Sequence, residues 1–250
     1  MPAAGPTLVD DAFVAKVNFG DRVLPILRAV TDAAQSPLLV KPRLRGVSHQ
    51  WAFFVSIGLG IALVITAPAG TATAAAAVYA ACVVTLFGSS ALYHRITWKR
   101  PNARRWMRRL DHSAIFLLIA GSYTPFALLV LDGTLADVIL VVMWAGALGG
   151  IVLKLVWIDA PNWLAATIYV ALGSVAVVVA PGLVSALGFT ASGLVGLGGL
   201  LYTVGAIVYA RRRPDPVPAV FGYHEVFHVL VIVAAGLQYA VVAFWVLPGA

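Results

Sequence analysis

Three histidines in this sequence are spaced as the nitrogen ligands of a metal site. His224 and His228 are four residues apart near the C-terminus, and His94 ends an apolar run much earlier in the chain. A helix would place the imidazoles of His224 and His228 on one face, with their Cβ atoms ~5–6 Å apart. A third histidine from a neighbouring helix leaves a fourth position open for water, as in catalytic zinc sites. The chain offers no oxygen-rich set for Mg²⁺ or Ca²⁺ here. We therefore predict that His94, His224 and His228 bind Zn²⁺.

Two further polar residues fall near the same predicted level. Ser90 precedes His94 by one helical turn, which is ~5.4 Å along the helix axis. Asp111 opens the next predicted helix, where its carboxylate could hydrogen-bond a water on the metal or orient a ligand. It could equally be a helix N-cap, for which aspartate is favoured. His112 and His49 are weaker candidates, and we expect His49 to be structural or interfacial.

The composition indicates an all-α membrane protein that crosses the bilayer several times. Of its 250 residues 61% are hydrophobic and 11% are charged, and the mean hydropathy is +0.94. Residues 46–94, 160–210 and 226–250 contain no Asp, Glu, Lys or Arg. Each run is at least as long as the ~20 apolar residues that a bilayer-spanning helix needs. An outer-membrane barrel would show short alternating segments instead.

Turn signals and charge clusters divide the apolar sequence into seven predicted helices. The breaks include Pro68-Ala69-Gly70, Asp132-Gly133 and Pro181-Gly182. The predicted spans are residues 51–67, 75–94, 111–131, 137–157, 163–180, 187–210 and 218–246. We expect a seven-transmembrane helix bundle over residues 46–250, preceded by a cytoplasmic N-terminal segment over residues 1–45. Residues 7–34 are compatible with a short helix or a loosely ordered arm.

The basic residues orient this bundle. All 17 Lys and Arg fall in the N-terminal segment, in the loop after the second span, at the end of the fourth span or after the sixth. The opposite loops hold only Asp132 and Asp137. The positive-inside rule then predicts a cytoplasmic N-terminus and an outside C-terminus. Because the charges flank the spans, we interpret the net charge of +7 as a topology signal and expect no nucleic-acid partner.

With this topology the three histidines share one depth on the cytoplasmic side. Each one alone is more simply an interfacial residue with a local hydrogen bond. Three at one level favour a function, because ionisable groups inside a membrane are costly and usually functional. His224-Glu225-Val226-Phe227-His228 also reads as H-E-x-x-H, the zincin signature in which Glu is the general base. An intramembrane metalloprotease would need a third, acidic ligand from a later span, and this motif lies in the last one.

Three segments together resemble the hemolysin III family, the bacterial branch of the progestin and adipoQ receptor family. Ser90-Ala91-Leu92-Tyr93-His94 matches the family's S-x-x-x-H, and His224 with His228 matches its C-terminal H-x-x-x-H. Residues 110–126 resemble its D-H-S stretch followed by G-[ST]-Y-T-P. Residues 41–49 are also typical, so the resemblance extends from about residue 40 to the end of the chain.

The resemblance implies seven transmembrane helices with the N-terminus inside, the orientation that the charges predict independently. Relatives such as adiponectin receptors and the more distant alkaline ceramidases hold zinc through three histidines near the cytoplasmic leaflet. The matching positions are His94, His224 and His228, with Ser90 and Asp111 beside the metal's water.

Our leading hypothesis is a zinc-dependent hydrolase of lipid amide or ester bonds, ceramidase-like, in the bacterial inner membrane. Its substrate would be an acyl lipid that enters from the bilayer, and the resemblance links such proteins to membrane-lipid homeostasis. The metal would ionise water near neutral pH and polarise the substrate carbonyl, with Asp111 and Ser90 as the catalytic residues. The alternative is a non-enzymatic sensor or a pore-forming, cytolytic protein in which zinc is structural.

Overall fold

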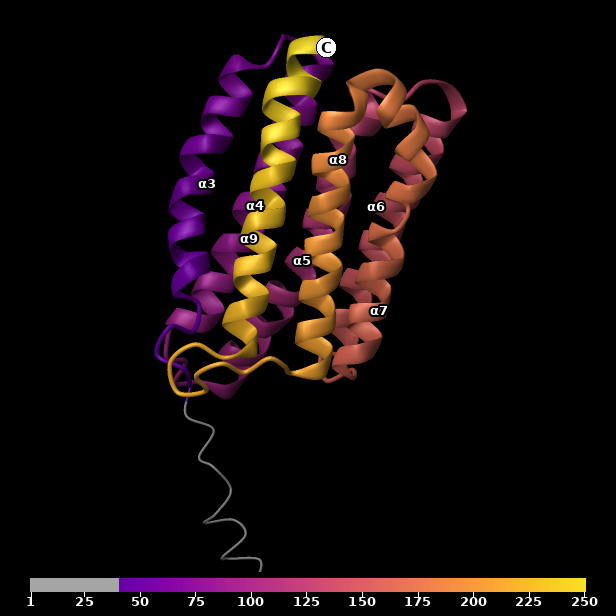
Figure 1. The fold of residues 1–250 in the computed structure, drawn as a ribbon. Coiled ribbons are helices and arrows are strands. Elements are labelled where there is room, and N and C mark those ends of the chain that lie inside the picture. The colour runs from indigo at the N-terminus through magenta and orange to yellow at the C-terminus, as the bar shows by residue number, and fades with distance from the viewer. Residues whose placement is uncertain (1–40) are drawn as a thin grey trace, which may run out of the picture. The chain divides into compact units, whose positions relative to one another are not determined.

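The structure is a computed structural model that describes residues 41–250, so the predictions for residues 1–40, including the helix or arm at 7–34, lie outside it. The described part is all-helical and contains no strand. Its helices run side by side in a bundle (Figure 1). They are α3 (Val47–Thr66), α4 (Thr71–Arg95), α5 (Pro101–Leu129), α6 (Gly133–Val156), α7 (Asn162–Gly173), α8 (Ala176–Arg211) and α9 (Tyr223–Val241), followed by a π-helical turn (Val242–Val246) and a 3₁₀ turn (Leu247–Gly249).

Six helical segments of the described chain are long and apolar enough to cross a membrane, and the protein is a multi-pass membrane protein. One of the six is Asn162–Arg211, which joins α7 and α8 over 50 residues. At 1.5 Å per residue a straight helix of this length would measure about 75 Å, more than twice the hydrocarbon core of a bilayer. It is not straight, because Gly188 has φ 79 and ψ 173, a backbone conformation open to glycine. Figure 1 shows the chain rising through α7 and returning along α8.

The expected break at Pro181-Gly182 is wrong, since both residues lie inside α8 and the interruption is at Gly188. Proline is tolerated inside membrane helices, where neighbouring helices and local adjustments satisfy the freed carbonyl group. Pro181 is the sixth residue of α8 and does not end the helix. The sequence therefore placed the break about seven residues before its position in the structure.

Helix α5 also starts earlier than expected, and this corrects the prediction for Asp111. The helix begins at Pro101, at the N-terminal position that suits proline, and runs to Leu129. Asp111 therefore lies in the third turn and is not an N-cap. Four of the seven basic residues expected in a loop instead lie in the first turns of α5, where the Arg109 guanidinium lies 4.9 Å from the Trp106 ring. Both side chains suit a membrane interface.

Helix α5 is the most enclosed of the candidate spans, whereas α3 is mainly exposed on the bundle surface. Phe116 of α5 is fully buried and packs against Gly150 of α6. A Cβ atom on Gly150 would lie 2.1 Å from Cε1 of Phe116, so only glycine permits this approach. Small residues at helix contacts are typical of membrane bundles.

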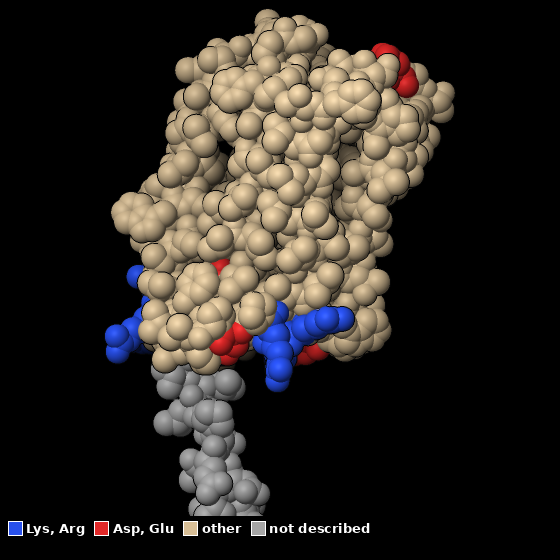
Figure 2. All heavy atoms as spheres, viewed as in Figure 1, with Lys and Arg blue, Asp and Glu red and all other residues tan. Residues whose placement is uncertain are grey.

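The basic residues gather at one end of the bundle. In Figure 2 Lys and Arg lie at one end of the visible face, and an acidic group marks the other end. The basic end includes the loop between α6 and α7, where Arg108 and Arg105 donate to the Asp159 carboxylate at 2.7 and 3.3 Å. The hydrogen bond from Arg108 holds the pKa of that exposed carboxyl below its usual value. The C-terminus lies at the end opposite to the start of α3 (Figure 1).

Candidate metal centre

The structure brings the three predicted metal ligands together from the two helices that were expected to carry them. His94 lies in the last turn of α4, and His224 and His228 lie in the first turns of α9. One ligand atom from each histidine lies within 4.8 Å of the other two, and all three residues are buried. The Nε2 atoms of His94 and His224 are 3.1 Å apart. Residues 130 positions apart in the sequence therefore face each other in one cluster.

The geometry and chemistry of this cluster fit a zinc ion. Tetrahedral zinc with Zn–N bonds of about 2.0–2.1 Å separates two imidazole nitrogens by about 3.3 Å. The His94–His224 separation is close to this value. Nδ1 of His228 is buried without a hydrogen-bond partner, which is costly unless a ligand satisfies the ring. Three neutral nitrogen donors suit zinc and other transition metals better than Mg²⁺ or Ca²⁺.

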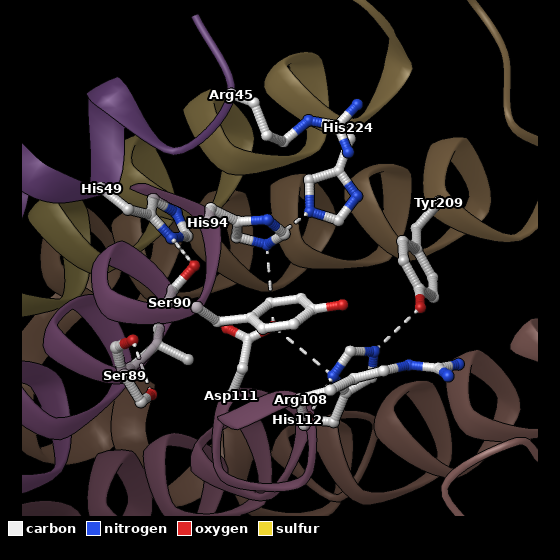
Figure 3. Close-up of polar contacts among 12 residues, drawn as sticks. Arg45, His49, Ser89, Ser90, His94, Arg108, Asp111, His112, Tyr209 and His224 are labelled. Atoms are coloured by element: carbon white, nitrogen blue, oxygen red, sulfur yellow. Dashed lines mark hydrogen bonds and ion pairs between the residues drawn. The ribbon is translucent and has the colours of Figure 1, made fainter. Parts of the chain in front are cut away.

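Asp111 and Ser90, the predicted catalytic residues, lie beside the histidines. Figure 3 shows the Asp111 carboxylate between His94 and His112. Its Oδ2 is 3.7 Å from Nε2 of His94 and 3.4 Å from Nδ1 of His112. Asp111 and Ser90 are both buried, at 8% and 2% exposure. A carboxylate and a hydroxyl thus flank the three imidazoles.

His49 also belongs to the site, although the sequence suggested a structural or interfacial role. Its Nδ1 lies 2.8 Å from Oγ of Ser90 (Figure 3). Its ring stacks on His228 with centroids 3.7 Å apart. Its depth in the membrane could have identified it from the sequence. His49 is the third residue of α3, and α3 starts at the end of the bundle where α4 ends.

Gly46 explains how the start of α3 comes so close to the cluster. Its φ of 77° is left-handed, and a Cβ atom at this position would lie 2.5 Å from Cβ of His94. Glycine meets both requirements, because it has no Cβ and readily adopts positive φ. The chain therefore turns into α3 directly over His94 and carries His49 into the site.

A second polar chain leads away from Asp111. Nδ1 of His112 faces the carbonyl oxygen of Arg108 at 2.8 Å, and its Nε2 faces the Tyr209 hydroxyl at 3.2 Å. That hydroxyl lies 3.3 Å from Oδ1 of Asn162, the first residue of α7. His112 was a weak candidate from the sequence. The structure places it next to Asp111, with polar contacts that continue through α8 to α7.

Glu225, the acidic residue of the H-E-x-x-H pattern, is already engaged at both carboxylate oxygens. Its Oε1 accepts from Nε of Arg45, and its Oε2 accepts from the backbone N–H of Gly222 at 2.8 Å. The residue is 1% exposed and caps the start of α9. The neighbouring backbone N–H groups of Arg43 and Leu44 donate to carbonyls of the α8–α9 loop. Glu225 therefore ties this loop and α9 to the segment before α3.

A cavity of about 430 Å³ extends from the polar cluster into the apolar part of the bundle. Its polar end is lined by His49, Ser90, Asp111, His112, Tyr209, His224 and His228. Its walls are mainly apolar and include Leu118, Val195 and Val231. It also reaches Gln238, ten residues beyond His228 and so about 15 Å further along α9. The site thus sits at one end of a long apolar chamber.

Comparison with known proteins identifies the family. Residues 38–239 match the family described as Haemolysin-III related. The chain is 34% identical to Hemolysin-3 of Bacillus cereus over 207 residues, which cover 82% of this chain and 91% of that protein. It is also 34% identical to the Hemolysin-3 homolog of Bacillus subtilis (strain 168) over 168 residues, 67% of this chain and 75% of that protein.

The protein belongs to the haemolysin-III family. The resemblance that the sequence motifs carried is thereby confirmed. In this haemolysin-III protein the three motifs, which are separated along the chain, meet at one end of the bundle. The α4 motif supplies Ser90 and His94, the α5 motif supplies Asp111 and His112, and the α9 motif supplies His224 and His228.

Proposed function

We propose that this haemolysin-III protein is a zinc-dependent hydrolase that cleaves the amide or ester bond of an acyl lipid. The observation that carries the proposal is that the cluster of His94, His224 and His228 adjoins the apolar cavity, whose polar end is lined by His224 and His228. A soluble substrate would not need an apolar chamber of this length. A purely apolar ligand would not need a buried set of imidazole, carboxylate and hydroxyl groups.

The shape of the cavity supports a substrate with one polar and one long apolar part. From the histidines to Gln238 the chamber extends about 15 Å, room for an extended hydrocarbon chain. The carbonyl group of such a lipid would lie at the polar end, next to Asp111 and Ser90. The lipid would enter from the bilayer, so membrane lipids are the expected partners.

Each polar residue then has a defined task. When bound, zinc supplies a Lewis acid that polarises a carbonyl and favours ionisation of water. The Asp111 carboxylate holds the attacking water and accepts its proton. The Ser90 hydroxyl donates a hydrogen bond to the water or to the oxygen on which negative charge develops. His94, His224 and His228 hold the metal, and the cavity wall keeps bulk water away from the reacting bond.

The proposed topology has seven crossings, with the cytoplasmic N-terminus and outside C-terminus predicted from the charges. The left-handed Gly188 supports two passes within Asn162–Arg211. The Lys and Arg at one end of the bundle support a cytoplasmic location of that end. The proposed membrane is the bacterial inner membrane, and the site would face its cytoplasmic leaflet.

Replacement of Asp111 tests the enzyme directly. We expect purified wild-type protein to contain about one zinc per chain and to release fatty acid from vesicles that contain an N-acylated sphingoid base or a diacyl phospholipid. The Asp111→Asn variant should retain zinc and lose hydrolysis by at least about 100-fold, as for removal of a general base. Asp137→Asn, at an exposed residue in the first turns of α6, is the matched control and should behave as wild type.

The second proposal is a sensor or a pore-forming, cytolytic protein in which zinc only links α4 and α9. The relative in Bacillus cereus is named Hemolysin-3, which favours a cytolytic activity. In this case Asp111→Asn would retain zinc and leave lysis of erythrocytes or leakage from vesicles unchanged. Absence of fatty-acid release from wild-type protein that contains zinc would contradict the enzyme and leave this second proposal.

A further inference from the structure

His49 makes a contact with Ser90 that a packing role does not require. Both residues are 2% exposed, and Nδ1 of His49 lies 2.8 Å from Oγ of Ser90. The His49 ring is held on two sides, stacked on His228 and edge-to-face with Phe87 at a centroid distance of 5.0 Å. These contacts fix the rotamer of His49. Its Nδ1 atom therefore stays directed at the Ser90 hydroxyl.

The hydrogen bonds of Ser90 indicate which group donates this one. Ser90 bonds the Asp111 side chain as well as Nδ1 of His49. A hydroxyl has one proton to donate, and an ionised carboxylate can only accept. The Ser90 proton is therefore directed at Asp111, and Nδ1 of His49 donates to Ser90.

The order of donors is then His49 to Ser90 and Ser90 towards Asp111. If the first bond ran the other way, the single proton of Ser90 would point at His49 and not at Asp111.

We propose that His49 is a positioning residue that turns the Ser90 hydroxyl proton towards Asp111 and the carbonyl oxygen of the substrate. The inference rests on the proposed hydrolase function, to which it adds a residue that acts through Ser90. His49 contacts neither the reacting bond nor the metal in this assignment. Its role depends on Nδ1, the ring nitrogen that contacts Ser90.

Three substitutions separate this role from packing. In His49→Asn the amide nitrogen is as many bonds from Cα as Nδ1, so it can still donate to Ser90. In His49→Gln the amide nitrogen corresponds to Nε2, and His49→Phe keeps a ring to stack on His228 but has no donor. We expect Gln and Phe to lower hydrolysis about 10-fold to 100-fold, the usual effect of removing a partner that orients a site. Asn should recover most of that loss, and all three variants should retain zinc.

A double variant tests whether His49 acts through Ser90. In a Ser90→Ala background there is no hydroxyl to orient, so adding His49→Phe should cause little further loss of hydrolysis. If the two losses multiply instead, the residues act independently and the proposal is wrong. It is also wrong if Asn is as impaired as Phe, or if Gln and Phe hydrolyse lipid at the wild-type rate.

A cobalt-substituted protein gives a readout that does not depend on turnover. The visible absorption of Co²⁺ reports its coordination and the hydrogen bonding around it. We expect the pH dependence of this spectrum to shift in His49→Phe and in Ser90→Ala and to remain near wild type in His49→Asn. If this pH dependence shifts but the wild-type protein hydrolyses no lipid, the proposed hydrolase is contradicted while the role of His49 is supported. An unchanged pH dependence in His49→Phe would overturn the role of His49, whatever the hydrolysis assay shows.

Discussion

At the residue scale, Glu225 is the test between a zincin-like protease and a hydrolase of another type. A general base must reach the water in the cavity, but Glu225 is not among the cavity-lining residues, and its two oxygens accept from Arg45 and the Gly222 N–H. We therefore expect Glu225→Gln to retain zinc and lipid hydrolysis. It should lower the free energy of unfolding by about 1–3 kcal/mol, because the Arg45 guanidinium loses a charged partner.

Thermal unfolding in detergent measures this effect, and Arg45→Gln provides the matched control. Because both substitutions remove the same ion pair, the double variant should be little less stable than either single variant. Loss of hydrolysis in Glu225→Gln with its zinc content intact would restore Glu225 as a general base. That result would favour the protease interpretation of H-E-x-x-H.

The metal itself gives a second prediction at this scale. A ligand that binds only the folded protein stabilises it, by about 2.7 kcal/mol at 100 times its dissociation constant. We expect a chelator to lower the unfolding temperature of the wild-type protein and to have no effect on His94→Ala. His112→Ala is the control, since His112 is a buried histidine at the site but not one of the three clustered ligands. Equal responses of wild type and His94→Ala to the chelator would exclude this metal site.

At the element scale, the close packing of α5 on α6 predicts a sharp difference between adjacent glycines. A Cβ atom on Gly150 would overlap the fully buried Phe116, whereas a Cβ atom on Gly149 would have no atom within 4 Å. Gly150→Ala should therefore destabilise the bundle by about 1–3 kcal/mol, the usual cost of overpacking. Gly149→Ala should be neutral or slightly stabilising, because alanine favours a helix over glycine.

Unfolding temperatures of the two variants in the same detergent measure the difference. The comparison is matched for residue type, helix and sequence neighbourhood, so helix propensity alone cannot produce opposite effects. Equal stability of both variants would show that α5 and α6 are not packed at Phe116 as described.

The sequence predicts the helices better than it predicts where each helix begins and ends. The apolar runs and the charged segments between them were sufficient to predict the helices, because a membrane imposes both length and polarity on each span. The start of α5 was missed because its first ten residues include four arginines, and apolar content cannot distinguish a basic helical turn from a loop. The reversal at Gly188 was missed because the Pro181-Gly182 pair is a stronger turn signal in the sequence than a single glycine.

The site shows the same limit. Histidine spacing predicted the cluster of His94, His224 and His228, since residues four apart on a helix share a face. The role of His49 depends on an α3–α4 contact over 41 positions of sequence, and that of Glu225 on a partner 180 positions away. No local pattern encodes such pairings. They follow from the way in which α3, α4 and α9 meet in the bundle.

At the scale of the whole molecule, the number of crossings decides on which side each loop lies. Six crossings would treat Asn162–Arg211 as a single pass and place Arg212 outside and the C-terminus inside. Seven crossings, with a reversal near Gly188, place Arg212 inside and the C-terminus outside. The two topologies agree on the earlier loops, so only the last third of the chain distinguishes them.

Accessibility of single cysteines to a membrane-impermeant thiol reagent in intact cells tests the seven-crossing topology. The background is Cys82→Ser, since Cys82 is the only cysteine of the chain. We expect labelling from outside at Asp132→Cys, Thr190→Cys and Ala250→Cys. Lys99→Cys and Arg212→Cys should label only after the cells are opened, because both lie at the basic end of the bundle. All five positions are exposed, so a failure to label reports the side of the membrane and not burial.

The decisive pair is Thr190 and Arg212. With one continuous pass, Thr190 would lie within the bilayer and resist the reagent in intact and opened cells alike, and Arg212 would be labelled from outside. That pattern would place the start of α9, with His224 and His228, next to the outer leaflet. His94 at the end of α4 would still lie on the inner side, so the three histidines could not form one cluster. Since His94 and His224 are in contact, only a topology that places the ends of α4 and α8 on one side is consistent with the site.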